Sequence, residues 1–358
     1  MEREETFFSQ GTYGCVNFPP IKCKGIKVPK QTISKLGIRD FFSKNELFIG
    51  KLLKQIENVN KNVKSSKMFV YYNDSCNIKK KKIEPYKDFY DKCKLLHKKR
   101  SKKDFTLLYG PYIPHSIQLS KYLNTNCSWN KIFLFYNFAL KVCRILKYYK
   151  IIHYDIKSSN ILVSNYQINE HGIVSNEPSF HLIDFGMSIS IDKALINDSL
   201  NLKYLYHFLF FSPSFNYWSI EHHILSYYLE YNMELSLEKL NEIISKLCNN
   251  NYVLEEMTNM KEYKIEIFEF YKKKLIQKMS IKERIEELFL SSYETWDMYS
   301  MCYLCLSSIY KNKLSQDIQC SSFIDMLQKG IHYDYNQRPS ISEHIDNFEG
   351  FLMTYSSD

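Results

Sequence analysis

The chain has 358 residues, and 48 Lys+Arg against 39 Asp+Glu give it a formal net charge of +9. A hydrophobic fraction of 45% with 16% aromatics excludes a disordered chain, and the length favours two compact parts over a single core. No uncharged apolar run reaches the roughly 18 residues that a membrane span requires. Two lysine runs, Lys79–Lys82 and Lys98–Lys103, carry much of the positive excess. Such runs are usually solvated loops, although phosphate-rich partners also attract them.

The N-terminal part of the chain shows strand and helix patterns. Residues 6–16 predict a strand, a glycine turn and a returning strand, and residues 31–36 predict a further strand. Apolar residues at helical spacing predict a helix over 41–56. The segments 67–72 and 105–109 are two more strand candidates on either side of a basic insert at about 78–103. We therefore expect a small antiparallel sheet and one helix.

The rest of the chain has a different character. Gly and Pro residues in "YGPYIP" interrupt the pattern, and a long helix is expected over 129–149. Two strand-like segments, 160–164 and 179–184, flank a polar loop, and the sequence from about 215 onward is mainly helical. The fold class expected from these patterns is α+β.

Ten cysteines are scattered without the spacings of a disulfide framework, and the opening "MEREETFF" lacks a signal-peptide pattern. We therefore expect free thiols and an intracellular, cytoplasmic protein. Cys302 and Cys305 form one C-x-x-C pair, but they lie in an apolar helical pattern with no second half-site. That setting favours core cysteines over a metal site.

The stretch "SQGTYGCV" contains Gly11 and Gly14 on either side of an aromatic residue. Glycines let a turn lie close to phosphates and present backbone N–H groups to them. Taken alone, an ordinary hairpin explains this stretch better. Lys35, on a predicted strand, is the candidate cation for the phosphates, and Glu46 on the following helix is its candidate partner. Lys27 and Lys30 are rival cations, although Pro29 makes their segment less strand-like.

The segment "IIHYDIKSSNILV" at 151–163 carries the strongest signal. Asp155 can accept the proton of an attacking hydroxyl, and Lys157 can reach a transferring phosphoryl group. Asn160 offers a neutral oxygen to a hard metal ion. His153 is expected to face inward and hold the backbone of this loop. These residue types at this spacing suit phosphoryl transfer.

The segment "FHLIDFGMS" at 180–188 places Asp184 at the end of a buried strand, followed by Phe185 and Gly186. A carboxylate in that position suits a Mg²⁺ ion that bridges phosphates, whereas an isolated Asp-Phe-Gly is usually a turn. The glycine turn, the strand lysine, His-x-Asp-x-Lys-x-x-Asn and Asp-Phe-Gly occur together in one order. That joint occurrence favours the catalytic interpretation.

With these motifs in this order, the sequence resembles the eukaryotic-type serine/threonine protein kinases along nearly its whole length. Glu221 in "NYWSIEHHIL", Arg338 in "HYDYNQRPSI" and Asp297 in "ETWDMYSMCYLCL" stand at three further positions of that family's pattern. The resemblance implies that Arg338 is the buried partner of Glu221 and that Asp297 hydrogen-bonds back to the catalytic loop. The composition and the "GTYGCV…PPIKC" opening also resemble those of divergent serine/threonine kinases of large DNA viruses.

The sequence departs from the family pattern in three places. Ser9 replaces the first glycine of the glycine loop. The separation of Asp155 from Asp184 is longer than usual, and the surplus at 165–178 is expected to form a surface hairpin. An additional helical insert at about 224–290 is a candidate docking or regulatory element.

The resemblance implies a bilobal fold, with a small antiparallel β-sheet N-lobe plus one helix and a larger, mainly α-helical C-lobe. Its parts would be an N-lobe at 1–108, a hinge at 109–114 and a C-lobe at 115–358 that contains the activation segment at 184–221.

The implied activity is ATP-dependent transfer of the γ-phosphoryl group to Ser/Thr hydroxyls of a protein substrate. ATP would lie between the lobes with Mg²⁺ or Mn²⁺, and nucleic acid is not expected as a partner. A viral enzyme would act in the host cytoplasm or the virion. The alternatives are a pseudokinase that serves as an ATP-binding scaffold and a small-molecule kinase on a related fold. The implied site residues are Asp155 and Lys157 in catalysis, Asn160 and Asp184 as metal ligands, and Ser9, Gly11, Tyr13, Gly14, Val16, Lys35 and Glu46 around the nucleotide.

Tyr154 stands where many relatives have an arginine that grips a phosphate on the activation segment. Tyrosine cannot offer a bidentate charged fork. We therefore hypothesise that activity does not require a phosphorylated activation segment, although Ser190, Ser199 and Ser212 lie within it.

Overall fold

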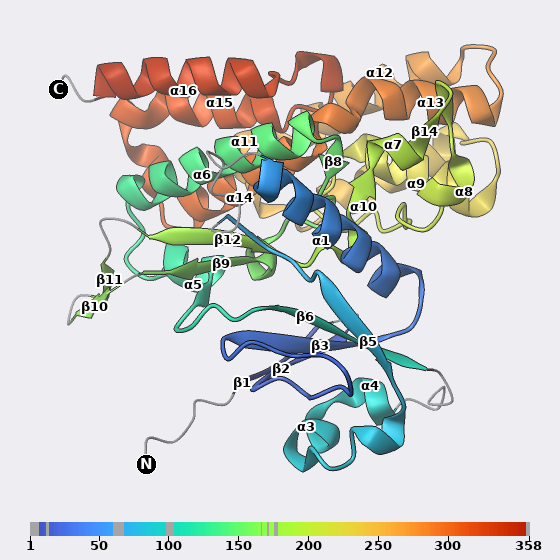
Figure 1. Cartoon of the computed structure of the whole chain (residues 1–358). Coiled ribbons are helices and arrows are strands. Elements are labelled where there is room, and N and C mark those ends of the chain that lie inside the picture. Colours follow the sequence, from blue (N-terminus) through green and yellow to red (C-terminus); the bar gives the residue numbers. More distant parts are fainter. Residues whose placement is uncertain are drawn as a thin grey trace. The chain divides into compact units, whose positions relative to one another are not determined.

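The computed structural model describes residues 7–11, 14–59, 68–97, 104–165, 167–169, 172–174 and 178–355. The chain divides into two compact units. Figure 1 colours the whole chain by sequence, from blue at the N-terminus to red at the C-terminus. The first unit contains Met1–Gln118, Asn160–Gln167 and Ser175–Ser188, and the second contains Leu119–Ser159, Ile168–Val174 and Ile189–Asp358. The predicted α+β class is confirmed, because strands dominate the first unit and helices the second.

The first unit is built on an antiparallel sheet in the order β1-β2-β3-β6-β5. Its strands are β1 (Phe7–Gln10), β2 (Gly14–Phe18), β3 (Thr32–Ile38), β5 (Asp74–Ile78) and β6 (Phe105–Pro111). The sequence did not predict β5, whose mixed polar residues lack a strand pattern. The predicted strand at 67–72 is reduced to β4 (Phe69–Val70), which pairs in parallel with β12 (Ser179–Ile183). A second sheet follows the order β4-β12-β9-β7, with β7 at Ile117–Gln118 and β9 at Ile161–Ser164.

Side chains along the strands of the five-stranded sheet alternate between its two faces. Each face is covered by a hydrophobic cluster. On one face Ile33 and Leu108 form a cluster against which Leu47 of α1 (Phe41–Val59) packs. Gly50 lets α1 lie close to the backbone of Tyr72, since a Cβ at position 50 would lie 1.9 Å from the Tyr72 carbonyl oxygen. On the other face Leu36 belongs to a cluster filled by the insert between β5 and β6.

The insert is more ordered than a solvated loop. It contains η1 (Lys80–Lys82), α3 (Lys87–Lys92) and α4 (Lys94–His97), and Phe89, Leu95 and Leu96 of these helices are buried in the cluster. Among the described residues of this unit, α3 and α4 therefore accompany α1, where one helix was predicted. Lys98–Lys103, the second predicted lysine run, lies outside the described residues.

The expectation that all cysteines are free thiols is wrong for four of the ten. Cys15 of β2 forms a disulfide with Cys93 after α3, and Cys23 forms one with Cys76 of β5. Both bonds join the insert and its strand to the segment after the glycine turn. Cys302 and Cys305 are free and buried, as predicted for core cysteines.

The second unit is built around α14 (Trp296–Lys311), most of whose residues are buried. The helices α6 (Trp129–Tyr148) and α15 (Ser321–Gly330) pack against it, and α16 (Ile341–Tyr355) packs against both of these; α5 (Leu119–Asn124) precedes α6 in the chain. The predicted helix at 129–149 corresponds to α6 within one residue. An aromatic cluster joins α6, α15 and α16, in which Tyr136 makes edge-to-face contacts with Phe323 and Phe348.

The predicted insert at about 224–290 is helical. It contains α9 (Ile220–Tyr231), α10 (Leu237–Cys248), α11 (Tyr252–Met257), α12 (Met260–Leu275) and α13 (Ile281–Ser292). Local sequence starts these helices: Ser236 caps α10, and Ser280 with Glu283 forms a capping box on α13.

Short elements complete the second unit. They are β8 (Ile151–Ile152), which pairs with β13 (Ile189–Ser190), and α7 (Ile191–Ala194), β14 (Leu195–Ile196), β15 (Ser199–Leu200) and α8 (Leu202–Leu205). The predicted surface hairpin corresponds to β10 (Gln167–Asn169) and β11 (Gly172–Val174), which form a two-stranded sheet. Across the described ranges, no helix has both the length and the apolarity of a membrane span.

Candidate active site

A buried lysine holds two carboxylates together in the first unit. Lys35 of β3 places its Nζ 2.7 Å from Glu46 Oε1 on α1 and 2.8 Å from Asp184 Oδ1, which follows β12. Lys35 and Glu46 are 7% and 4% exposed, so water screens this pair little. The ion pair predicted between Lys35 and Glu46 is present. The rival cations, Lys27 and Lys30, are exposed in the loop between β2 and β3.

The charges of this cluster are unbalanced, because one ammonium serves two carboxylates. Burial lowers the pKa of Lys35, but the charges of Asp184 and Glu46 outweigh it and raise that pKa above its ordinary value. Burial raises the pKa of Glu46 to about 7; the Lys35 charge opposes this rise and Asp184 adds to it. The cluster therefore keeps Lys35 charged, and a further cation beside it would be stabilised by the second carboxylate.

The Asp-Phe-Gly segment is anchored to α1 by a residue that sequence reasoning did not find. Asn45 donates its side-chain N–H to the carbonyl oxygens of Gly186, at 3.1 Å, and Ser188, at 2.8 Å. Asp184 adopts a left-handed backbone with φ 68°, a conformation that is uncommon for non-glycine residues. Phe185 is buried against Phe69. No local signal could have separated Asn45 from any other polar residue on a helix.

The glycine turn joins β1 and β2 in the same unit. Gly11 donates its backbone N–H to the Gly14 carbonyl oxygen, and Ser9 pairs in register with Val16. Only glycine fits at position 14, since a Cβ there would lie 2.6 Å from the Leu36 carbonyl oxygen. Val16 pairs in register with Lys35, so the turn leads directly to the strand beside that lysine. Tyr13 lies outside the described residues.

Two oxygen donors of the first unit suit a hard divalent ion. Asp184 supplies a carboxylate and Asn160, at the end of η2 (Ser158–Asn160), supplies an amide oxygen. In the described part of the chain, no group of three His, Cys, Asp or Glu side chains is arranged to hold a metal. This donor set still fits Mg²⁺, which commonly takes one or two protein ligands and completes its shell with waters and phosphate oxygens.

The predicted catalytic pair lies in the second unit. Lys157 Nζ contacts Asp155 Oδ1 at 2.9 Å and Oδ2 at 2.8 Å, and Asp155 is 5% exposed. Asp297 of α14 accepts the backbone N–H of His153 at 2.7 Å and that of Tyr154 at 2.9 Å. This is the hydrogen bonding that the resemblance implied for Asp297. Burial raises the pKa of Asp297, while His153 and the two N–H donors lower it.

Tyr154 is fully enclosed by aromatic residues. Its ring lies 4.8 Å from that of Trp218, 5.3 Å from His222 and 5.9 Å from Trp296, between ring centroids. Trp218 donates its indole N–H to the Tyr154 carbonyl oxygen at 2.8 Å. Burial lowers the pKa of His222 well below its ordinary value, and the neighbouring His223 and Arg338 lower it further, so its ring stays neutral. No local pattern could have predicted this cluster, because its members come from three segments that lie far apart in the chain.

Glu221 and Arg338 form a buried bidentate pair in the second unit. Arg338 Nη1 lies 2.5 Å from Glu221 Oε1, and Nη2 lies 2.9 Å from Oε2. Both side chains are almost fully enclosed. The pairing that the resemblance implied is therefore present.

The chain matches no model of a known protein family and no curated protein. The chemistry of the residues described above is therefore the basis for a functional proposal.

Proposed function

We propose that the chain is an ATP-dependent protein kinase that phosphorylates Ser or Thr hydroxyls of a protein substrate. The observation that carries the proposal is the buried Lys35 ammonium, fixed by Glu46 and Asp184 from two different elements. A fixed cation of this kind suits the phosphate oxygens of ATP, because it is already oriented before the nucleotide binds. The glycine turn beside its strand offers backbone N–H groups to the same phosphates.

The second unit supplies the groups for the transfer itself. Asp155 orients the substrate hydroxyl and accepts its proton as the oxygen forms a bond to the γ-phosphorus and the bond to the bridging β-γ oxygen breaks, which releases ADP. Lys157 offsets the negative charge of the phosphoryl group during transfer, and its contact with Asp155 holds both side chains in place. Asp297 keeps the loop backbone fixed through two N–H groups.

Asp184 and Asn160 would hold a Mg²⁺ ion, which neutralises charge on the phosphates when bound. Lys157 also supports the Ser/Thr assignment through the family resemblance, since the tyrosine-specific branch has a different residue there. Two other functions are consistent with the same residues: an ATP-binding scaffold without transfer, and phosphorylation of a small molecule.

The proposal is tested by incubating the protein with radiolabelled ATP, Mg²⁺ and generic basic and acidic proteins. We expect phosphate on Ser and Thr, and a loss of about 10²–10⁴-fold in rate for Asp155→Asn with nucleotide binding retained. Asp325→Asn, an exposed carboxylate on α15, is the matched control and should keep full activity.

Three results would contradict the proposal. A thermal shift with ATP but no transfer would indicate a scaffold. Transfer to aminoglycoside or choline substrates, and not to protein, would indicate a small-molecule kinase. An active Asp155→Asn variant would refute the role of that residue.

A further inference from the structure

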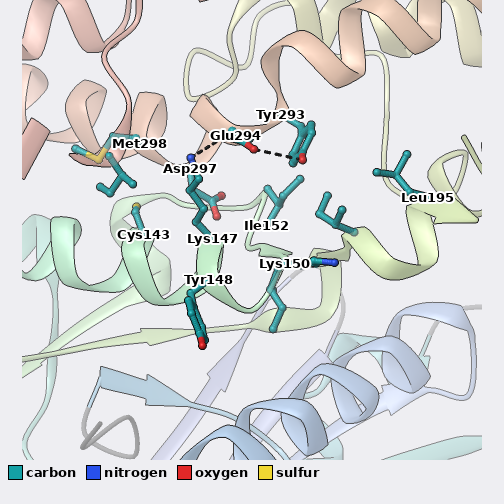
Figure 2. Close-up of a pocket in the computed structure, with 13 residues that line it drawn as sticks. Cys143, Lys147, Tyr148, Lys150, Ile152, Leu195, Tyr293, Glu294, Asp297 and Met298 are labelled. Atoms are coloured by element: carbon teal, nitrogen blue, oxygen red, sulfur yellow. Dashed lines mark hydrogen bonds and ion pairs between the residues drawn. The ribbon is translucent and has the colours of Figure 1, made fainter. Parts of the chain in front are cut away.

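A cavity of about 340 Å³ lies in the second unit, on the side of the catalytic loop formed by α6, α14 and the start of α16 (Figure 2). Its lining also includes β8, which leads directly into His153, and α7 with β14, which follow the Asp-Phe-Gly segment. The cavity is at the small end of the range for ligand pockets. The proposed reaction makes no use of it.

The floor of the cavity is apolar and buried. Ile151, Ile152, Ile191 and Met298 line it, and each is at most 6% exposed. Cys143 adds a thiol whose pKa is raised by burial and by the neighbouring Asp297 and Cys302, so it stays protonated and uncharged. A ligand that places carbon against this floor would gain from the removal of apolar surface from water.

The mouth of the cavity carries two exposed lysines, and Lys150 has the more exposed ion pair. Lys147 is held by Glu294 at 2.6 Å, and Figure 2 shows Glu294 linked in turn to the Tyr293 hydroxyl. Lys150 contacts Asp192 at 3.2 Å, and their side chains are 64% and 72% exposed. Such an exposed pair contributes little, so its ammonium can turn to a ligand at small cost.

Neither acidic residue of the lining is available to a cationic ligand without losing its present contacts. Glu294 contacts Lys147 and the Tyr293 hydroxyl. Asp297 also lines the cavity, but both of its carboxylate oxygens accept backbone N–H groups of the catalytic loop. A cationic head at the floor would compete with those bonds. The polarity of the cavity therefore favours an apolar body inside and a negative group at the mouth.

We infer that this cavity binds a small monoanionic amphiphile, with a ring or branched-chain body and one carboxylate or sulfonate end that pairs with Lys150. Its body would contact Ile151 and Ile152 before the catalytic loop and Ile191 after the Asp-Phe-Gly segment. Because β8 and β13 pair in this region, occupancy would restrain both segments at once. If the proposed kinase function holds, the site is regulatory; binding itself does not depend on that function.

Binding is tested with two matched probes, the anionic fluorophore 8-anilinonaphthalene-1-sulfonate and its neutral analogue N-phenyl-1-naphthylamine. Fluorescence titration of the full chain should show both probes bound at one site. Ile341→Trp narrows the cavity and should weaken the binding of both probes by about tenfold, because the larger side chain occupies space that the probe would fill. Lys150→Gln should weaken the sulfonate probe by about two- to fivefold and leave the neutral one unchanged. Lys141→Gln, exposed on α6 outside the cavity, is the control and should change neither.

Hydrogen–deuterium exchange then locates the bound probe without any assay of catalysis. We expect the sulfonate probe to protect residues 150–155 and 189–196, and this protection to be lost in Ile341→Trp. The inference fails if neither probe binds the folded chain, or if Lys150→Gln weakens both probes equally. It also fails if protection falls elsewhere. None of these results depends on whether the chain transfers phosphate.

Discussion

At the scale of single residues, the clearest departure from simple charge pairing is the sharing of Lys35 by two carboxylates. A lysine with one partner would lower the pKa of that carboxylate, but here Glu46 is buried and also faces Asp184. The result is a carboxyl group that takes up a proton near neutral pH. In the proposed complex, a bound metal ion would supply the positive charge that this cluster lacks.

The raised pKa of Glu46 predicts a specific pH dependence of stability. Its pKa is about 7 in the folded chain and 4.5 ordinarily, so between these values the folded state binds more protons than the unfolded state. Stability from this group is therefore complete below pH 4.5 and is lost as the pH rises through 7. Glu46→Gln should remove this loss, which amounts to about 1–3 kcal/mol.

The measurement is denaturant unfolding between pH 5 and 8 for the parent chain and Glu46→Gln. Glu84→Gln, an exposed residue in the insert of the same unit, is the control and should follow the parent. If the stability of the parent and of Glu46→Gln changed in parallel across this interval, the carboxylate would be ionised at all these pH values and the assignment would be wrong.

Tyr154 gives the hypothesis of phosphorylation-independent activity a structural basis. Its side chain is occupied by packing against Trp218, His222 and Trp296, within the second unit. The residue stabilises the backbone of the catalytic loop through buried aromatic contacts, where an arginine would present a charge.

Substitutions at Tyr154 distinguish packing from charge recognition. Tyr154→Phe keeps the ring and should cost less than about 1 kcal/mol, whereas Tyr154→Ala should cost about 3–5 kcal/mol. Tyr154→Arg should be as damaging as the alanine, because it buries an unpaired charge. Tryptophan fluorescence of the neighbouring Trp218 and Trp296 monitors unfolding. A Tyr154→Arg chain as stable as the parent would show that this site accepts a cation.

At the scale of elements, the helices and the polar loops could be predicted because their signals are local. Apolar spacing predicted α6, and the order of His153, Asp155, Lys157 and Asn160 predicted the loop to which we assign the proposed catalytic residues. The strand β5 was not predicted, because it has no alternating apolar pattern of its own. Its contact with the hydrophobic cluster depends on the insert that packs there. The disulfides could not be predicted either, because their partners are separated by 78 and 53 residues.

The buried pair between Glu221 of α9 and Arg338 joins two segments far apart in the second unit. Removing one member leaves an uncompensated buried charge, so Glu221→Gln should cost about 3–5 kcal/mol in unfolding free energy. Glu242→Gln, which removes the exposed contacts of that carboxylate with Lys239 and Lys246 on α10, should have a much smaller effect because solvent screens them. Chemical unfolding followed by tryptophan fluorescence compares the two. Equal effects would mean that the buried pair contributes no more than a surface one.

At the scale of the whole molecule, the residues with proposed roles are divided between the two units. Lys35, Glu46, Asn160 and Asp184 belong to the first and Asp155 with Lys157 to the second. The covalent links and the buried ion pair that stabilise the fold, and the tryptophans, are divided between the units too. Both disulfides lie in the first unit, and the three tryptophans and the Glu221–Arg338 pair lie in the second. Each unit can therefore be perturbed and observed by itself.

This division predicts that a reductant destabilises only one part of the chain. Each disulfide closes a long loop and stabilises by about 2–4 kcal/mol, so reduction should lower the melting temperature of the first unit by about 5–15 °C. Calorimetry should show the unfolding transition of the first unit at a lower temperature after reduction. The unfolding temperature of the second unit, followed by tryptophan fluorescence, should not change. Glu221→Gln should give the reverse pattern. Mass spectrometry of the unreduced protein should show the Cys15–Cys93 and Cys23–Cys76 links, and Cys127, Cys143, Cys248, Cys302, Cys305 and Cys320 as thiols. If reductant shifted both transitions together, the two units would unfold as one.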